Sequence, residues 1–479
     1  MGSLKKNFVY SSLLTTANFI FPLLTFPYVS RVLGANNIGI VNFVDSIISY
    51  FVLFSMLGVG TIGIREVASS RTNKKDLSNV FSSLLTLTGI LTAISIVTLF
   101  ICTLFLPQLS DKREVCLLGG FKLAFSFLLV EWFYKGLEEF RYITIRTLII
   151  KSIYVAFVFI FVRKSEDYNI YYLLTILMVV INAIVNIIYS RRFTKYSFNE
   201  ITIGKYIKPC VVLGGYGILT SLYTTFNVSF LGFVSNDLQV GYYTVAIKLY
   251  SIFLAFFTAF TGVMMPRMSA LVANNELLKF KEALTKSSEI LIMFSIPIII
   301  FSSFFARDII YLIAGDGYSG SVVPFRIIVP LVFIIGYEQI LVIQILMPLR
   351  RDSIVFRNSL IGAALSIVLN ILLVDKFKAI GSAIVWVSCE SVILFLSQIV
   401  VSRSLDIKFP YKKISRCLVL FMPMGITYYI AIGILGESIY LMFAAVIWTI
   451  IYFIIVQLYF FPTGIVATNI HRISKTFFR

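Results

Sequence analysis

Long apolar stretches alternate with short polar gaps along almost the whole chain. An α-helix needs about 20 predominantly apolar residues to cross the ~30 Å hydrocarbon core of a bilayer. About fourteen segments meet this condition, and the pattern therefore predicts an all-α polytopic membrane protein. The segments cover approximately residues 8–30, 38–62, 79–106, 115–134, 147–162, 170–190, 209–233, 239–264, 287–310, 323–347, 357–374, 381–402, 415–435 and 439–461.

The positive charges divide between the polar gaps in a regular way. Of the 41 Lys and Arg residues, 30 lie in every second gap, beginning with Lys5 and Lys6, and nine lie in the other gaps. The remaining two, Lys122 and Lys248, fall within spans. Because cytoplasmic loops are enriched in Lys and Arg, this bias predicts both termini in the cytoplasm. The alternation also supports the number of spans, since one missed span would reverse the side of every later gap.

The composition excludes several classes of protein. The chain is 59% hydrophobic and 13% charged, and its net charge of +18 is explained by loops that face an anionic leaflet, so no nucleic-acid partner is expected. The single histidine, His471, and five scattered cysteines exclude histidine catalysis and a metal site. No GxxxxGK[ST] phosphate loop is present, so ATP hydrolysis is not expected. We expect no cofactor; an ion gradient, the membrane potential or the substrate gradient would supply the energy.

A polar break at residues 191–208 separates the first six spans from the next six. Shifting the chain by 202 positions aligns Gly39 with Gly241 and Arg65 with Arg267, although a chance match of common residues would look the same. The pattern predicts two six-helix bundles, residues 1–208 and 209–402, related by a pseudo-two-fold axis around a central cavity. Residues 403–479 would add two helices and a basic cytoplasmic tail, amphipathic from Thr463 onward.

Three segments carry a family likeness. They are FPLLTFPYVSRVLGANNIGIVNF at residues 21–43, EWFYKGLEEFRYITIRTLIIK at 131–151 and VGYYTVAIKLY at 240–250. The chain resembles bacterial flippases for the repeat units of O-antigen and capsule, within the multidrug/oligosaccharidyl-lipid/polysaccharide exporter superfamily.

The resemblance implies alternating access and export of undecaprenyl-diphosphate-linked oligosaccharides from the inner to the outer leaflet of the bacterial cytoplasmic membrane. It implies a role in cell-surface polysaccharide synthesis. The implied partners are this lipid-linked oligosaccharide, membrane lipids and the polysaccharide polymerase machinery.

Ionisable residues inside spans are costly unless they face a polar path, so each is a candidate site residue. Asp45 and Lys248 lie at similar depths in the second and eighth spans, Glu338 lies in the middle of the tenth, and Arg31 ends the first. We expect these four residues to line the substrate path. A second group of candidates comprises Asn18, Arg65, Glu131, Arg267 and Glu390.

Each candidate also has an ordinary structural interpretation. Lys248 can snorkel toward the interface, and Arg31 can be an interfacial anchor. Asp45 can pair with Lys248, bind a coupling Na⁺ or H⁺, or join a local polar network. Glu338 can take part in proton coupling or be a neutral acid that links two helices. We expect Lys122 and Arg326 to snorkel toward the interface. We expect Arg65 and Arg267 to be loop charges that set the topology.

Two other functions compete with the flippase. A cation-coupled drug exporter of the same superfamily would carry cationic substrates, which predicts an acid-lined cavity. A membrane polysaccharide polymerase or glycosyltransferase would need a soluble domain or catalytic outer loops, and no outer gap here exceeds about fifteen residues. A peptidoglycan-precursor flippase is a further alternative within the transporter class.

Overall fold

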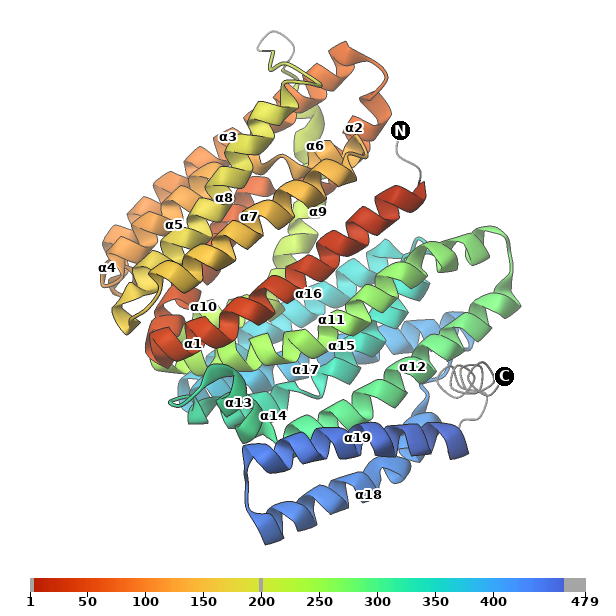
Figure 1. Ribbon diagram of the computed structural model, residues 1–479. Helices are drawn as coiled ribbons and strands as arrows, with labels where there is room; N and C mark the ends of the chain where they lie inside the picture. Colours follow the sequence, from red (N-terminus) through yellow and green to blue (C-terminus); the bar gives the residue numbers. More distant parts are fainter. Residues whose placement is uncertain (1–3, 198–200, 461–479) are drawn as a thin grey trace, which may run out of the picture. The chain divides into compact units, whose positions relative to one another are not determined.

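A computed structural model of the chain describes residues 4–197 and 201–460. Within these ranges every regular element is a helix, as the apolar pattern predicts (Figure 1). The helices separate into two compact units, which we describe in turn. The expected amphipathic tail from Thr463 onward lies outside the described residues, and the division into bundles 1–208 and 209–402 remains a prediction.

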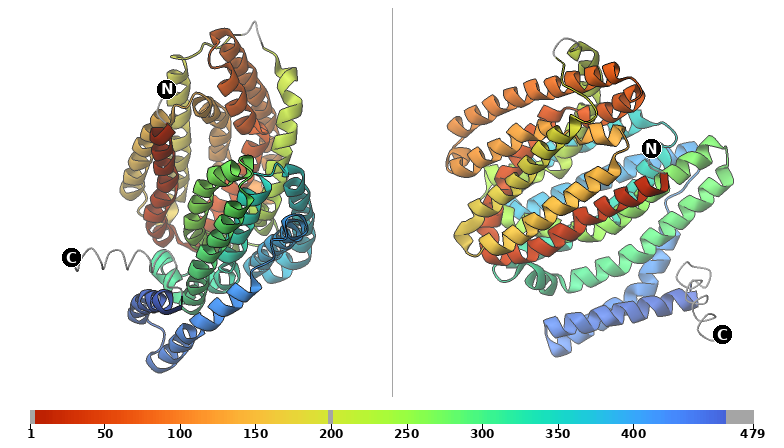
Figure 2. Two further views of the ribbon diagram at one scale, coloured as in Figure 1. Left: turned by 90° about the vertical axis from the view of Figure 1, so that its right-hand side faces the viewer. Right: turned by 45° about the horizontal axis from the view of Figure 1, so that its top comes forward.

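Unit 1 comprises Met1–Val245, Ala314–Gly320 and Ser359–Cys389. Its long helices lie side by side, and α7 packs against both α1 and α8 (Figures 1 and 2). Its elements are α1 (Leu4–Met56), α2 (Val59–Ser70), α3 (Lys74–Phe105), α4 (Pro107–Ser110), α5 (Arg113–Ser126), η1 (Phe127–Leu129), α6 (Glu131–Gly136), α7 (Phe140–Phe161), η2 (Ser165–Asp167), α8 (Tyr168–Ser190), α9 (Ile203–Thr224), α10 (Phe226–Val234) and η5 (Asn370–Val374), with parts of α11 (Asp237–Ala273), η3 (Ser319–Ser321), α16 (Asp352–Leu369) and α17 (Asp375–Leu405).

Unit 2 comprises Ala246–Ile313, Ser321–Asn358 and Glu390–Arg479. Its α12 packs against α15, α18 and α19. The unit contains the remaining parts of α11, η3, α16 and α17, together with α12 (Leu277–Phe304), nearly all of α13 (Ala306–Ala314), α14 (Val322–Ile328), α15 (Leu331–Gln339), the π-helical η4 (Ile340–Leu346), α18 (Tyr411–Leu435) and α19 (Ile439–Phe460).

The described residues contain 11 helical segments long and apolar enough to cross a membrane, or 12 if the bent pair α9 and α10 forms one span. Two segments are exceptionally long, at 62 and 54 residues. Each contains a residue with non-helical backbone angles, Gly34 in α1 and Lys378 in α17. Both residues fall in gaps between predicted spans. The multi-pass architecture is confirmed, and the number fourteen remains a prediction.

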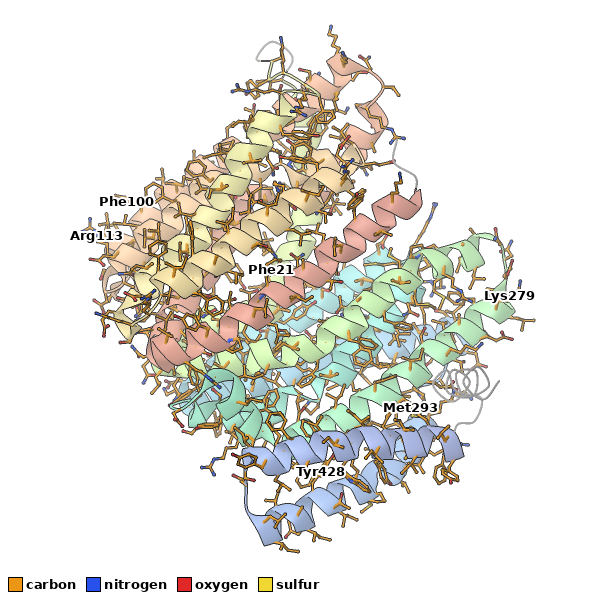
Figure 3. All side chains as sticks on the ribbon, in the orientation of Figure 1. Phe21, Phe100, Arg113, Lys279, Met293 and Tyr428 are labelled. Atoms are coloured by element: carbon orange, nitrogen blue, oxygen red, sulfur yellow. The ribbon has the colours of Figure 1, made fainter. Side chains whose placement is uncertain are left out.

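Apolar side chains cover the outside of the bundles. Phe100 of α3, for example, is 51% exposed and projects away from unit 1 (Figure 3). In a chain that crosses a bilayer many times, such side chains meet acyl chains rather than water. The polar side chains that matter for function are therefore the ones inside the bundles.

Two glycines allow α1 and the beginning of α11 to approach very closely within unit 1. A Cβ atom at Gly39 would lie 1.7 Å from the carbonyl oxygen of Asp237, and one at Gly241 would lie 1.9 Å from that of Ala35. Both are collisions with backbone, which cannot swing aside as a flexible side chain can. Small residues are a common means of close helix packing in membranes. These are also the two glycines that the 202-residue shift aligns.

Gly39→Ala should destabilise the protein strongly, because the added methyl group would have to push α11 away from α1. We expect a loss at or above the upper end of the ~1–3 kcal/mol typical of overpacking, measured by thermal unfolding of the purified protein in detergent. Gly215→Ala in α9 is the matched control, because a Cβ there meets no atom within 4 Å. Equal unfolding temperatures for the two variants would contradict this account of the crossing.

Candidate functional site

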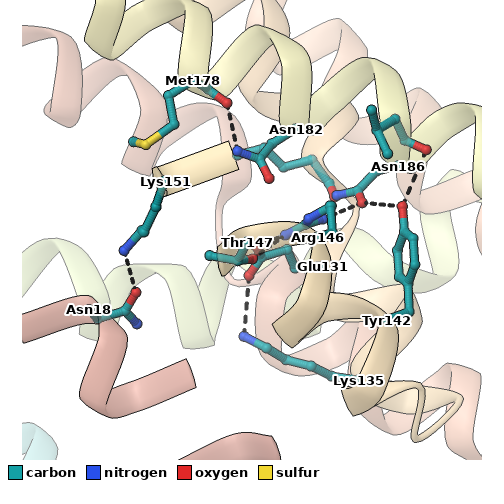
Figure 4. A network of polar contacts seen from close by, with 12 residues as sticks. Asn18, Glu131, Lys135, Tyr142, Arg146, Thr147, Lys151, Met178, Asn182 and Asn186 are labelled. Carbon is teal, nitrogen blue, oxygen red and sulfur yellow. Dashed lines mark hydrogen bonds and ion pairs between the residues drawn. The ribbon is translucent and has the colours of Figure 1, made fainter. Parts of the chain in front are cut away.

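A network of polar contacts in unit 1 joins α6, α7 and α8. We call Glu131, Tyr142, Arg146 and Asn186 the Arg146 cluster (Figure 4). One Arg146 Nη donates to Glu131 Oε1 at 3.0 Å, and the other donates to Asn186 Oδ1. The Tyr142 hydroxyl donates to the same Asn186 oxygen at 3.1 Å. The cluster therefore ties three helices together through one guanidinium and one amide.

A break in the helix between α5 and α6 places Glu131 in this cluster. The break is at Val130, which is fully buried and has a left-handed φ of 37° and ψ of 32°. Such angles are unfavourable for a β-branched residue, so surrounding contacts must hold them. The carbonyl of Leu129 accepts a hydrogen bond from Asn186 Nδ2, and the Tyr134 hydroxyl donates to the Asn186 carbonyl. The Asn186 side chain thus supplies a hydrogen-bond donor for the Leu129 carbonyl, which the helix break leaves without a helical partner.

Aromatic packing anchors the short helix α6 directly after Glu131. Trp132, Phe133 and Tyr134 are each no more than 3% exposed. The ring of Phe133 lies 4.8 Å from that of Phe81 on α3 and 5.5 Å from that of Tyr134, centroid to centroid. Because these rings are immobilised, Glu131 at the first position of α6 has a fixed direction of approach to Arg146.

Arg146 lies inside the bundle, which the sequence did not reveal. As part of the gap before a span at 147–162, it was expected to be a cytoplasmic loop charge, and this expectation was wrong. The helix α7 begins at Phe140, and the Arg146 side chain is only 4% exposed. The compensating Glu131 is fifteen residues earlier and across a helix break, so no helical spacing of the sequence pairs the two.

Lys151 of α7 lies five residues beyond Arg146 and contacts α1. Its Nζ donates to Asn18 Oδ1 at 2.6 Å and lies 5.9 Å from the ring centroid of Phe21 (Figure 4). Of the second group of candidates, Asn18 and Glu131 are therefore both in contact with cations of α7. The acceptor from Asn18 is a neutral amide, so this contact is not an ion pair.

Asp45 forms a second polar group in unit 1, with Lys122 and Tyr172. Its Oδ1 accepts from Lys122 Nζ at 2.5 Å and from the Tyr172 hydroxyl at 3.1 Å. The side chains of Lys122 and Asp45 are 18% and 34% exposed. Lys122 was expected to snorkel toward the interface; instead it is held inside the bundle by this ion pair. The structure thus places Asp45 in a local polar network, one of the three roles considered for it, and its pairing with Lys248 remains a prediction.

The candidates in unit 2 include a pair of carboxyl groups. Glu338 of α15 and Glu390 of α17 lie close enough to interact with each other, and Tyr250 of α11 lies close enough to interact with both. Glu390 is only 3% exposed. Glu338 also directly precedes Gln339 and the π-helical η4, and such irregular turns often occur at functional sites.

The remaining candidates are more exposed. Lys248 is exposed although it lies within the membrane-spanning helix α11. Arg31 lies against Gly315, where an added Cβ would be 2.8 Å from its side chain. Arg65 is 67% exposed and contacts its neighbour Glu66, and Arg267 is also exposed. The structure therefore brings Asn18, Glu131 and Asp45 into polar groups of unit 1 and leaves Arg65 as a surface charge.

The arrangement provides for binding rather than for catalysis. Lys122, Arg146 and Lys151 put three cations within the helices of unit 1, each hydrogen-bonded to a named acceptor. Among the described residues, no group of three or more His, Cys, Asp and Glu side chains is placed to hold a metal ion. Such fixed cations can stabilise an anionic group inside a membrane protein, where water cannot.

Removing the Arg146 guanidinium should destabilise unit 1. Breaking a buried ion pair costs about 3–5 kcal/mol, and we expect Arg146→Ala to lie near the lower end because the Glu131 side chain is 39% exposed. Arg146→Lys should restore only part of the loss, since an ammonium cannot bridge two acceptors as a planar guanidinium does. Thermal unfolding of the purified variants measures both effects.

Arg65→Ala is the control for this series, because its ion pair with Glu66 is exposed and should be worth at most about 1 kcal/mol. If Arg146→Ala were no less stable than Arg65→Ala, the Arg146 cluster would not hold the three helices together.

Comparisons with solved structures show the fold. The chain superimposes on the lipid II flippase MurJ in an inward closed conformation with a TM-score of 0.78, covering 95% of this chain and 99% of that one at 15% identity. It superimposes on an inward-facing multidrug resistance transporter of the MATE family with a TM-score of 0.60, covering 80% and 94% of the two chains at 14% identity.

Sequence comparison gives the family. The chain is 24% identical over 403 residues to a protein of Escherichia coli named as an O-antigen transporter, covering 82% of this chain and 95% of that protein. It is 25% identical over 384 residues to a protein of Haloferax volcanii named as a flippase, covering 77% of each. The family described as polysaccharide biosynthesis protein matches residues 4–272, more than half of the chain. The chain therefore belongs to the polysaccharide biosynthesis protein family.

Proposed function

We propose that this protein is a flippase that exports undecaprenyl-diphosphate-linked oligosaccharide units by alternating access for cell-surface polysaccharide synthesis. It would act in the bacterial cytoplasmic membrane, with both termini in the cytoplasm. Membership of the polysaccharide biosynthesis family and relatives named as an O-antigen transporter and a flippase support this function. A transporter of this kind moves its substrate without making or breaking covalent bonds in it.

The observation that carries the proposal is the presence of cations inside the membrane-spanning helices. The head group of the substrate bears a diphosphate and polar sugars, neither of which can enter hydrocarbon unaided. The acceptor of Lys151 Nζ is a neutral amide rather than a carboxylate, and Lys248 is exposed within α11. A charge inside a membrane is costly, by about 2.5–3.5 kcal/mol or more at its centre, so Lys248 is best accommodated on a water-filled path. A path lined with cations suits an anionic head group.

The energy can come from the membrane potential. With the interior negative, outward movement of an anion gains about 2.3 kcal/mol per charge per 100 mV. A coupling Na⁺ or H⁺ is an additional candidate source, with Asp45 and the Glu338–Glu390 pair as its sites. Neither route needs a bound cofactor. The expected further partner is the polymerase machinery that would use the exported units.

The same cations argue against the drug exporter. Substrates of such exporters are typically cationic and would be repelled by cations that line their path. The likeness to a MATE transporter concerns the fold, which many functions can share.

The test is deletion of the gene, followed by analysis of surface polysaccharide and mass spectrometry of undecaprenyl-linked sugars from the same cells. We expect loss of the surface polymer and accumulation of completed lipid-linked units. Complementation with Lys248→Ala should restore at most about one tenth of the polymer made by the wild type, because a hydrogen bond to a charged group is worth about 1.5–3 kcal/mol.

Lys248→Arg tests charge, and it should restore more polymer than Lys248→Ala at equal protein level. Lys279→Ala is the matched control, because Lys279 is 71% exposed and pairs with Glu276, which directly precedes α12. Normal polymer in the deletion strain, with no accumulated intermediate and no second flippase, would refute the proposal. Increased drug sensitivity of that strain would then favour the exporter.

A further inference from the structure

A groove of about 550 Å³ lies between α7 and α8 of unit 1, and Tyr142 and Arg146 of the Arg146 cluster form part of its wall. Cationic and aromatic side chains gather near the beginning of α7, and apolar ones extend along it. Its wall includes Arg141, Tyr142, Arg146 and Tyr189, followed by Ile145 and Ile149. The groove is thus polar at one end and apolar at the other, as an amphipathic ligand is.

The apolar part of the groove opens toward lipid. Ile145 and Ile149, one helical turn apart on α7, are 42% and 55% exposed. Side chains at this spacing share one face of a helix. On α8, Val185, which also lines the groove, is 36% exposed. In a chain that crosses a bilayer, such exposed apolar side chains lie against acyl chains, so the groove is reached from the membrane.

The polar end of the groove carries a surplus of positive charge. Arg141 is exposed at the beginning of α7, and Arg146 is buried in the groove wall, where its Nε has no hydrogen-bond partner. Glu139 lies at the same end. Since Glu131 already contacts both Arg146 and Lys135, the ion pairs leave the balance positive. An anion there would also meet the positive end of the α7 dipole.

Two tyrosine rings form a flat wall beside these charges. The rings of Tyr142 and Tyr189 are stacked with centroids 3.7 Å apart and planes 9° apart. The Tyr142 hydroxyl is held by Asn186, so its ring is fixed in place. Aromatic rings with a polar tip favour the level of the lipid head groups, where one end is apolar and the other wet.

We propose that this groove seats an anionic phospholipid of the bilayer. Its phosphate would contact Arg141, with Arg146 adding charge from the wall, and its acyl chains would follow Ile145 and Ile149 along α7. The apolar length of the groove favours a lipid over a soluble anion. The net positive charge favours an anionic head group over a zwitterionic one, whose ammonium would cancel it. The seat is formed by α7 and α8 alone and does not depend on which oligosaccharide is transported.

The test is native mass spectrometry of the purified full-length protein in detergent, titrated with phosphatidylglycerol or phosphatidylethanolamine of the same acyl chains. We expect phosphatidylglycerol to bind more tightly. Arg141→Gln should weaken its binding about fivefold, the effect of one basic residue at a membrane surface, and change phosphatidylethanolamine binding little. Arg141→Lys should retain the preference.

Arg113→Gln, which removes an exposed arginine at the beginning of α5, is the matched control and should bind both lipids as the parent does. Equal binding of the two lipids, or equal effects of Arg141→Gln and Arg113→Gln, would overturn the proposal. Displacement of phosphatidylglycerol by equimolar undecaprenyl phosphate, with the same dependence on Arg141, would also overturn it, because the seat would then belong to the carrier lipid.

Discussion

A backbone amide or carbonyl that faces hydrocarbon has no water to bind, so a chain that crosses a bilayer repeatedly must be helical wherever it meets lipid. Departures from the helix are tolerated only where the protein itself supplies partners. The break at Val130 follows this rule, because the side chain of Asn186 takes up the freed carbonyl of Leu129. A second break, at Gly34 in α1, lies between two predicted spans. There the chain has the positive φ that glycine adopts readily.

The same constraint governs charge. Within unit 1, Arg146, Lys122 and Lys151 are each held by an acceptor from another helix. These contacts lower the free-energy cost of burying the three basic side chains inside the bundle. In unit 2, Lys248 is exposed, and Glu338 and Glu390 lie close enough to each other to interact.

The sequence allowed the all-helical membrane fold to be predicted, because the hydrophobicity of a stretch of about twenty residues can be read locally along the chain. Its resemblance to polysaccharide flippases also agreed with the family found by comparison. The contacts between charged side chains were harder to predict, since they depend on which helices become neighbours. Arg146 looked like a loop charge because its partners, Glu131 and Asn186, lie on other helices and one lies beyond a break. Lys122 looked like an interfacial residue until α5 was placed beside α1 and Asp45.

The central claim is that this chain alone moves a lipid-linked anionic oligosaccharide across a bilayer. The most direct measurement uses the purified protein in liposomes loaded with an undecaprenyl-diphosphate-linked oligosaccharide, with the outward-facing fraction read from its accessibility to an added glycosidase. We predict that the protein brings the protected half of the substrate to the outside, and faster when the potential favours outward movement of anions. A protected fraction that stays constant in protein-containing liposomes, as in empty ones, would contradict the account.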